Sequence, residues 1–202
     1  MKRLSLAILL LCSSLALAQD IRVSYQGKSP SISDFVGALL SSTANDDEED
    51  CSDEARNALK QAWAQHLKGK PQESGTTFTI DAKNGYAAYE SKDGEHLLRI
   101  EMCYWNEADK KHKLFAYNVV SFTNGKYEPG QFDGISFYRY DNASKKMTLT
   151  ADVGFERIYS TDGGWISYEL PRSGKDITMN TWYEKEKKQN TLKWDGRRFK
   201  LQ

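Results

Sequence analysis

The sequence predicts an α+β fold in which two N-terminal helices cover part of an antiparallel meander sheet of roughly eight to ten strands, twisted or partly barrel-like. Apolar residues recur with helical spacing near the N-terminus, and from residue 76 onward they alternate with period two. Asn-Gly and Asp-Gly pairs, which are strong signals for hairpin turns, interrupt the alternating part. These pairs begin at Asn84, Asp93, Asn124, Asp162 and Asp195.

The helical part is expected at about residues 31–70. The first helix begins at Ser33, a good capping residue, and presents one apolar face to the core. The second helix begins after Asp50 or Ser52 and ends near Gly69, which together with the following Pro cannot continue a helix. Its apolar stripe has the spacing of a helix that lies on a core. The stripe consists of Ala55, Leu59, Ala62, Trp63 and His66.

The β meander is expected at about residues 76–202. Because the connections between strands are short, neighbouring strands should run antiparallel. In the strand at 96–105, Ile100 and Met102 share the face assigned to the core. Glu101 and Cys103 share the other face, which is either wetter or covered by the helices. The expected strands are 76–80, 85–89, 96–105, 111–122, 134–140, 147–153, 165–170, 177–183 and 191–201, the last interrupted by a turn at Asp195.

Residues 1–18 have the pattern of a signal peptide. Lys2 and Arg3 precede a short apolar run, and an Ala-x-Ala ending predicts cleavage after Ala18. This leaves a single exported domain at 19–202, located in the periplasm or outside the cell. Two alternatives are an N-terminal membrane anchor, for which the run is short, and a lipid anchor on Cys12, which lacks the usual small residue before it.

Cleavage at that point leaves two cysteines, Cys51 and Cys103. An exported chain enters an oxidising compartment, so we expect these two residues to form a disulfide. A bridge that closes a loop of roughly 50 residues contributes on the order of 4 kcal/mol in the chain-entropy model. The alternative is a pair of free, buried thiols.

Charge and spacing exclude several classes of function. Lys and Arg together number 28, as do Asp and Glu, so the basic excess of a nucleic-acid-binding protein is missing. No window beyond the signal peptide is long and apolar enough for a transmembrane segment. The Lys pairs at 110–111, 145–146 and 187–188 are interpreted as solubilising residues at hairpin tips.

Motifs for catalysis, cofactors and metals are also missing. The chain has no nucleophile elbow and no phosphate-binding Gly loop, so we expect no catalytic residue and no cofactor. The acidic run at 46–50 lacks the Gly of a calcium loop and is interpreted as a solvated linker. No metal site is expected, because the three histidines lack ligand spacing. They are His66, His96 and His112.

Aromatic residues near the C-terminus give the best functional indication. Trp165, Trp182 and Trp194 are the candidate binding residues, because Trp on a strand face beside polar side chains is typical of a contact surface. The favoured function is a non-catalytic binding module for a protein or glycan partner. One alternative is a small-ligand carrier with a β-barrel cavity. The other is a hydrolase of polysaccharide or peptidoglycan that uses paired carboxylates, with Glu101, Asp152, Glu156 and Glu169 as candidates.

Overall fold

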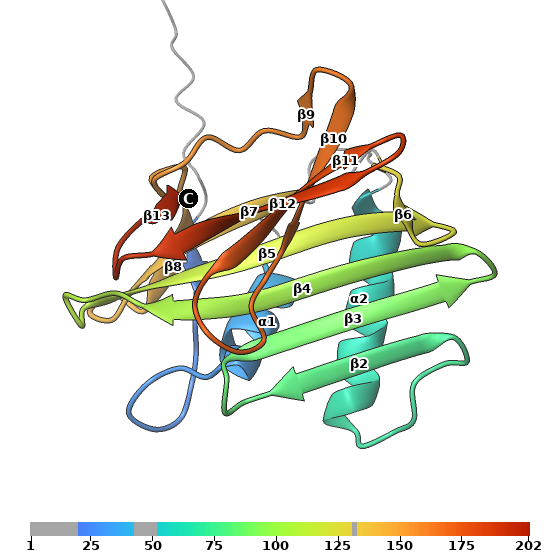
Figure 1. The fold of residues 1–202 in the computed structure, drawn as a ribbon. Coiled ribbons are helices and arrows are strands. Elements are labelled where there is room, and N and C mark those ends of the chain that lie inside the picture. The colour runs from blue at the N-terminus through green and yellow to red at the C-terminus, as the bar shows by residue number, and fades with distance from the viewer. Residues whose placement is uncertain (1–19, 43–51, 131–132) are drawn as a thin grey trace, which may run out of the picture.

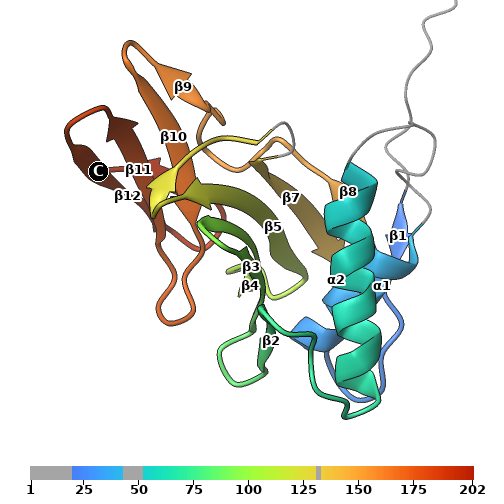
Figure 2. The ribbon, with the colours of Figure 1, turned by 90° about the vertical axis from the view of Figure 1, so that its right-hand side faces the viewer.

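The computed structural model describes residues 20–42, 52–130 and 133–202. Its elements form three layers, with a large sheet between two helices on one side and a smaller sheet on the other (Figures 1 and 2). The helices are α1 (Ile32–Ser41) and α2 (Ser52–Leu67). No helix in these described ranges is long and apolar enough to cross a membrane.

The large sheet has eight strands, seven of them in the order β1-β8-β7-β5-β4-β3-β2, while β6 pairs with β5. All of its neighbouring strands run antiparallel. Its strands are β1 (Ile21–Arg22), β2 (Thr76–Asp81), β3 (Tyr86–Asp93), β4 (His96–Asn106), β5 (His112–Thr123), β6 (Lys126–Tyr127), β7 (Gly134–Asp141) and β8 (Lys146–Leu149).

The small sheet has five antiparallel strands in the order β13-β12-β11-β10-β9. The turn at Asp195 separates its last two strands, as expected. Its strands are β9 (Ser160–Thr161), β10 (Gly164–Glu169), β11 (Ile177–Tyr183), β12 (Lys187–Trp194) and β13 (Phe199–Leu201).

The prediction of a mostly antiparallel β protein with two helices is therefore confirmed. The prediction of one meander of eight to ten strands is wrong, because the strands divide into sheets of eight and five. The chain leaves the large sheet after Leu149, where the expected strand 147–153 ends early. Gly154 has a φ of +92°, and a Cβ there would lie 2.4 Å from the carbonyl oxygen of Phe199. The chain thus bends where it passes close to β13 and enters the small sheet.

The two helices had been expected to come first in the fold, but β1 precedes them in the chain. Ile21 of β1 pairs with Met147 of β8, far away in the sequence. The cap of α1 is Ser31 and not Ser33. The Asp34 backbone N–H donates to Ser31 Oγ, and the Ser31 backbone N–H donates to Asp34 Oδ2 at 2.7 Å, which completes a capping box.

Two cores lie on the two faces of the large sheet. On the helix side, the fully buried Phe35 of α1 packs its ring 5.3 to 5.4 Å from the rings of Tyr104, Phe115 and Tyr140. Ile100 and Met102 face this core, as the alternation in β4 predicts. Between the two sheets lies a second core, which contains Cys103, Trp105, Leu114, Phe137, Val153, Tyr168, Ile177, Leu192 and Phe199.

The expected disulfide is not present in the described part of the chain. Cys103 is a buried free thiol, and Cys51 lies outside the described residues. Cys103 belongs to the core between the sheets, whereas α2 covers the opposite face. The face of β4 that carries Cys103 is therefore covered by the small sheet and not by the helices.

A buried polar cluster joins the two sheets within this second core. The Glu101 carboxylate of β4 accepts from Tyr86 Oη at 2.9 Å, from Asn118 Nδ2 at 3.2 Å and from the Leu170 backbone N–H at 3.2 Å. Asn118 Nδ2 also donates to the carbonyl oxygen of Tyr168 in β10 at 2.7 Å. Since Asn118 belongs to the large sheet, these bonds fix where the small sheet lies on it.

Candidate functional site

Two of the three predicted tryptophans lie side by side in the small sheet. Trp165 of β10 and Trp182 of β11 are directly opposed partners in the antiparallel ladder. Opposed residues place their side chains on the same face, with Cβ atoms roughly 5 Å apart. Trp165 is 51% exposed, and Trp182 is half-buried. The β10–β11 hairpin thus presents an accessible indole beside a partly sheltered one.

Two clefts with volumes of about 580 and 570 Å³ meet at Trp182 and Lys187, which line both of them. The first cleft extends toward the turns of the large sheet, and the second extends along Trp165 and Tyr183. Both are open surface clefts. We call them together the Trp182 groove. Its main lining residues are Arg99, Phe122, Tyr127, Trp165, Trp182 and Lys187.

Trp182 is held in place by contacts from both sheets. Its Nε1–H donates to the Ser167 hydroxyl oxygen at 2.8 Å. The rings of Phe122 and Tyr127, on β5 and β6, lie 6.0 and 6.3 Å from it between ring centroids. Lys187 Nζ lies 4.5 Å from the indole centroid in a cation–π contact. The indole is therefore fixed before any ligand arrives, which lowers the entropy cost of binding.

The rim of the Trp182 groove is charged with mixed sign. Lys187 pairs with Glu169 at 3.5 Å, and Arg99 pairs with Glu90 at 2.7 Å while lying 5.7 Å from the Phe122 centroid. These ion pairs leave N–H donors and carboxylate acceptors beside the aromatic surface. The other charged lining residues are Lys92, Glu95, Lys126, Glu184, Lys185 and Glu186.

Trp194 does not belong to this groove. It packs against the core between the sheets, with its ring 4.9 Å from Phe199 and 5.9 Å from Trp105 between centroids. It lies at the far end of β12 from Lys187, and seven residues of extended chain span about 23 Å. The structure thus brings together Trp165 and Trp182 and places Trp194 apart from them, against the core between the sheets.

The four carboxylates considered for hydrolysis do not converge. Glu101 is buried between the sheets, and Asp152 pairs with Arg198 at 2.6 Å. Glu156 is exposed in the segment that connects the sheets. Of these four residues, Glu169 alone lines either cleft of the groove. It accepts from Asn180 Nδ2 at 2.7 Å in addition to its ion pair with Lys187.

Sequence reasoning missed the groove residues of the large sheet. Phe122 and Tyr127 flank the Asn124-Gly125 turn, and Phe122 is the ladder partner of Tyr127. That turn could have placed the two rings together, but only the docking of the second sheet places them against Trp182. Lys187 was interpreted as a solubilising residue, and it instead covers an indole.

A cluster of side chains of the metal-binding type was also not expected from the sequence. Ligand atoms of Glu107, Asp109 and His112 lie within 4.8 Å of one another. The His112 ring forms a 2.6 Å bond with Asp109, which lowers the pKa of that carboxyl to about 2. Arg139 Nε donates to Glu107 at 2.7 Å. His112 Nε2 also lies 3.2 Å from Asp141 Oδ2, so each side chain of this group already has a partner in the chain.

Comparison of the chain with protein-family models, with curated proteins and with solved structures gives no match. The feature that the described residues offer is an open groove in which one indole is accessible and its neighbour is fixed.

Proposed function

We propose that this chain is an exported, non-catalytic binding module and that the Trp182 groove binds a glycan chain. The observation that carries the proposal is the pairing of the half-exposed Trp165 with the fixed Trp182 on one face of an open groove. Export is proposed from residues 1–18, which lie outside the described residues.

A glycan suits this surface for two reasons. The C–H face of a sugar ring is apolar and flat, so it packs well on an indole, and aromatic side chains provide large contact area at low entropy cost. Sugar hydroxyls both donate and accept hydrogen bonds, and the rim of the groove offers both kinds of partner in its Lys, Arg and Glu side chains. Two clefts in series favour an extended chain over a compact ligand.

The alternatives receive less support from the same residues. A hydrolase needs two carboxyl groups on either side of the bond that is cleaved, and Glu169 is engaged with Lys187 and Asn180. A carrier needs a cavity that encloses its ligand, and the two clefts of the groove are open. A protein partner would use the same indoles and is distinguished from a glycan by experiment.

The test is a glycan-array screen of the chain 19–202, followed by titration of each positive oligosaccharide with tryptophan fluorescence as the readout. The array should include neutral β-glucans, chitin oligosaccharides and peptidoglycan fragments. We expect Trp165→Ala to weaken binding roughly 30-fold, because an aromatic hot spot contributes about 2 kcal/mol. The fold should be retained, because exposed side chains change stability by only about 0.5 kcal/mol.

The matched control is Leu149→Ala in the large sheet, since Leu149 is 50% exposed and lines neither cleft. This variant should bind like the parent chain. An array with no positive glycan overturns the glycan assignment. An equal loss of affinity in Trp165→Ala and Leu149→Ala overturns the assignment of the groove as the binding site. If the chain instead captures a protein and Trp165→Ala abolishes that capture, the ligand of the groove is a protein and not a glycan.

A further inference from the structure

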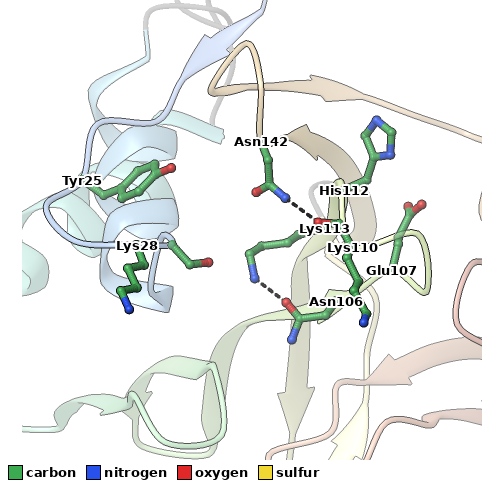
Figure 3. A pocket seen from close by; sticks show the side chains of 9 residues that line it. Tyr25, Lys28, Asn106, Glu107, Lys110, His112, Lys113 and Asn142 are labelled. Carbon is green, nitrogen blue, oxygen red and sulfur yellow. Dashed lines mark hydrogen bonds between the residues drawn. The ribbon is translucent and has the colours of Figure 1, made fainter.

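A second pocket lies on the other side of the fold and shares no lining residue with the Trp182 groove. Its volume is about 430 Å³. It is an open pocket between the segment that joins β1 to α1, the β4–β5 hairpin and the β7–β8 turn (Figure 3). We call it the Lys113 pocket. Its lining residues are Tyr25, Lys28, Ser29, Asn106, Glu107, Lys110, His112, Lys113 and Asn142.

Lys113, the second residue of β5, is unusual for a Lys because it is only 7% exposed. Its ammonium donates to Asn106 Oδ1 and lies 4.8 Å from the centroid of the Tyr104 ring. Burial lowers the pKa of this amine. Within the described ranges, no carboxylate lies at ion-pair distance from Lys113 Nζ. A buried charge is normally compensated by an opposite charge.

The ammonium has a free direction that leads into the pocket. It carries three N–H donors, of which one is used by Asn106 and one side faces the Tyr104 ring. In Figure 3 the Lys113 amine extends into the space between Asn106 and the segment that carries Lys28. A ligand in that space would meet an ammonium without a counter-ion.

The rest of the pocket adds positive charge. Lys28 and Lys110 are exposed at its border, and Ser29 and the Asn106 amide offer further neutral polar groups. Glu107 is the one carboxylate among the lining residues, and it accepts from Arg139 Nε at 2.7 Å. Its charge is therefore already compensated from outside the pocket. Three Lys side chains thus line a space that holds no uncompensated acid, and the Lys113 amine is the one that extends into it (Figure 3).

From this arrangement we propose that the Lys113 pocket binds a phosphate group, either free or as part of a small phosphate ester. Lys ammonium groups are common ligands of phosphate, and a charge-assisted hydrogen bond is about twice as strong as a neutral one. The volume exceeds what a single phosphate fills, so there is room for the small organic part of an ester. The bound anion would supply the counter-charge that Lys113 lacks.

The experiment is isothermal titration of the chain 19–202 with inorganic phosphate and, in a second arm, with glycerol phosphate. Sodium chloride at matched ionic strength is the reference. We expect saturable binding in at least one arm and an affinity that falls at least tenfold in Lys113→Met. Tighter binding of glycerol phosphate would assign the site to an ester, and equal affinity would assign it to the phosphate group alone.

The matched control is Lys111→Met, because Lys111 is exposed, is two residues away in the same hairpin and does not line the pocket. Its phosphate affinity should equal that of the parent chain. If Lys113→Met does not fold, as judged by circular dichroism, the double variant Lys28→Met/Lys110→Met takes its place and should also bind at least tenfold more weakly. No saturable binding, or equal loss in the control, overturns the proposal.

Discussion

Replacing Glu101 by Leu should destabilise the protein strongly, and replacing it by Gln should not. Leu removes the acceptor of the Tyr86 hydroxyl and the Leu170 backbone N–H, while Asn118 keeps its bond to the Tyr168 carbonyl oxygen. A buried donor that loses its acceptor costs about 1 to 3 kcal/mol. The two orphaned donors therefore lower the free energy of unfolding by about 2 to 6 kcal/mol, a large part of the total stability of a domain.

Gln keeps an acceptor in the same place. Its carbonyl oxygen can receive the two N–H groups that now bond Glu101 Oε2, and the Tyr86 hydroxyl can accept from the new amide instead of donating. We expect Glu101→Gln to change the free energy of unfolding by less than about 1 kcal/mol at neutral pH. The measurement is urea unfolding followed by tryptophan fluorescence.

The pH dependence of stability provides a second measurement, which compares the parent chain with Glu101→Gln. Burial raises the pKa of the Glu101 carboxyl above its ordinary value of 4.5, against the lowering effect of its hydrogen bonds. Between these two pKa values the folded chain retains a proton that the unfolded chain has lost, so the free energy of unfolding falls as pH rises through this window. Glu101→Gln should lack that fall. The difference in the free energy of unfolding between the parent chain and Glu101→Gln should therefore be constant at pH values above the window.

Two results would refute this reasoning about Glu101. One is a Leu variant as stable as the parent chain, which would show that the polar cluster contributes nothing to docking of the sheets. The other is a Gln variant as unstable as the Leu variant, which would show that the charge matters and the acceptor geometry does not.

Two further predictions follow from the connection between the sheets and from the buried thiol. Gly154→Ala should cost several kcal/mol more than Gly174→Ala in urea unfolding, because both have a positive φ but only Gly154 has a backbone oxygen 2.4 Å from the added Cβ; equal costs would contradict this. Cys103 should resist a thiol reagent in the folded chain and react in concentrated guanidinium, since burial raises its thiol pKa well above the ordinary value. A mass increase of about 2 Da on reduction would instead show a bridge to Cys51.

Local patterns predicted the elements well where one physical signal dominated. The apolar stripe from Ala55 to His66 predicted α2, which covers Ser52–Leu67. Alternation in β4 separated Ile100 and Met102 from Glu101 and Cys103 correctly. Strict periodicity fixes the face of an element, because the side-chain period is set by backbone geometry alone.

Long-range pairing left no comparable signal. The two-residue strand β1 pairs with β8 through contacts such as Ile21 with Met147, which no local pattern predicts. Alternation also could not say what covers each face of a sheet. It left the Cys103 face either wet or under the helices, whereas a second sheet covers it.

The candidate site, like the fold, was predictable where local patterns decide it and not where the docking of the two sheets decides it. Composition singled out three tryptophans, and the hairpin between β10 and β11 aligns two of them. Trp194 lies outside the Trp182 groove, and its position against Phe199 and Trp105 depends on how the sheets dock, which the sequence pattern does not show. Lys113 gave no signal at all, since its burial results from neighbouring elements rather than from its own strand.

Docking of the sheets and ligand binding should therefore be coupled. The Trp182 groove has walls from both sheets, with Phe122 on the large sheet and Trp165 and Trp182 on the small one. The buried bonds of Glu101 and Asn118 fix the relative position of these walls without lining either cleft. A substitution that loosens those bonds should thus weaken binding in the groove from a distance. A loss of stability of similar size on the helix face of the large sheet should leave the groove, and its affinity, intact.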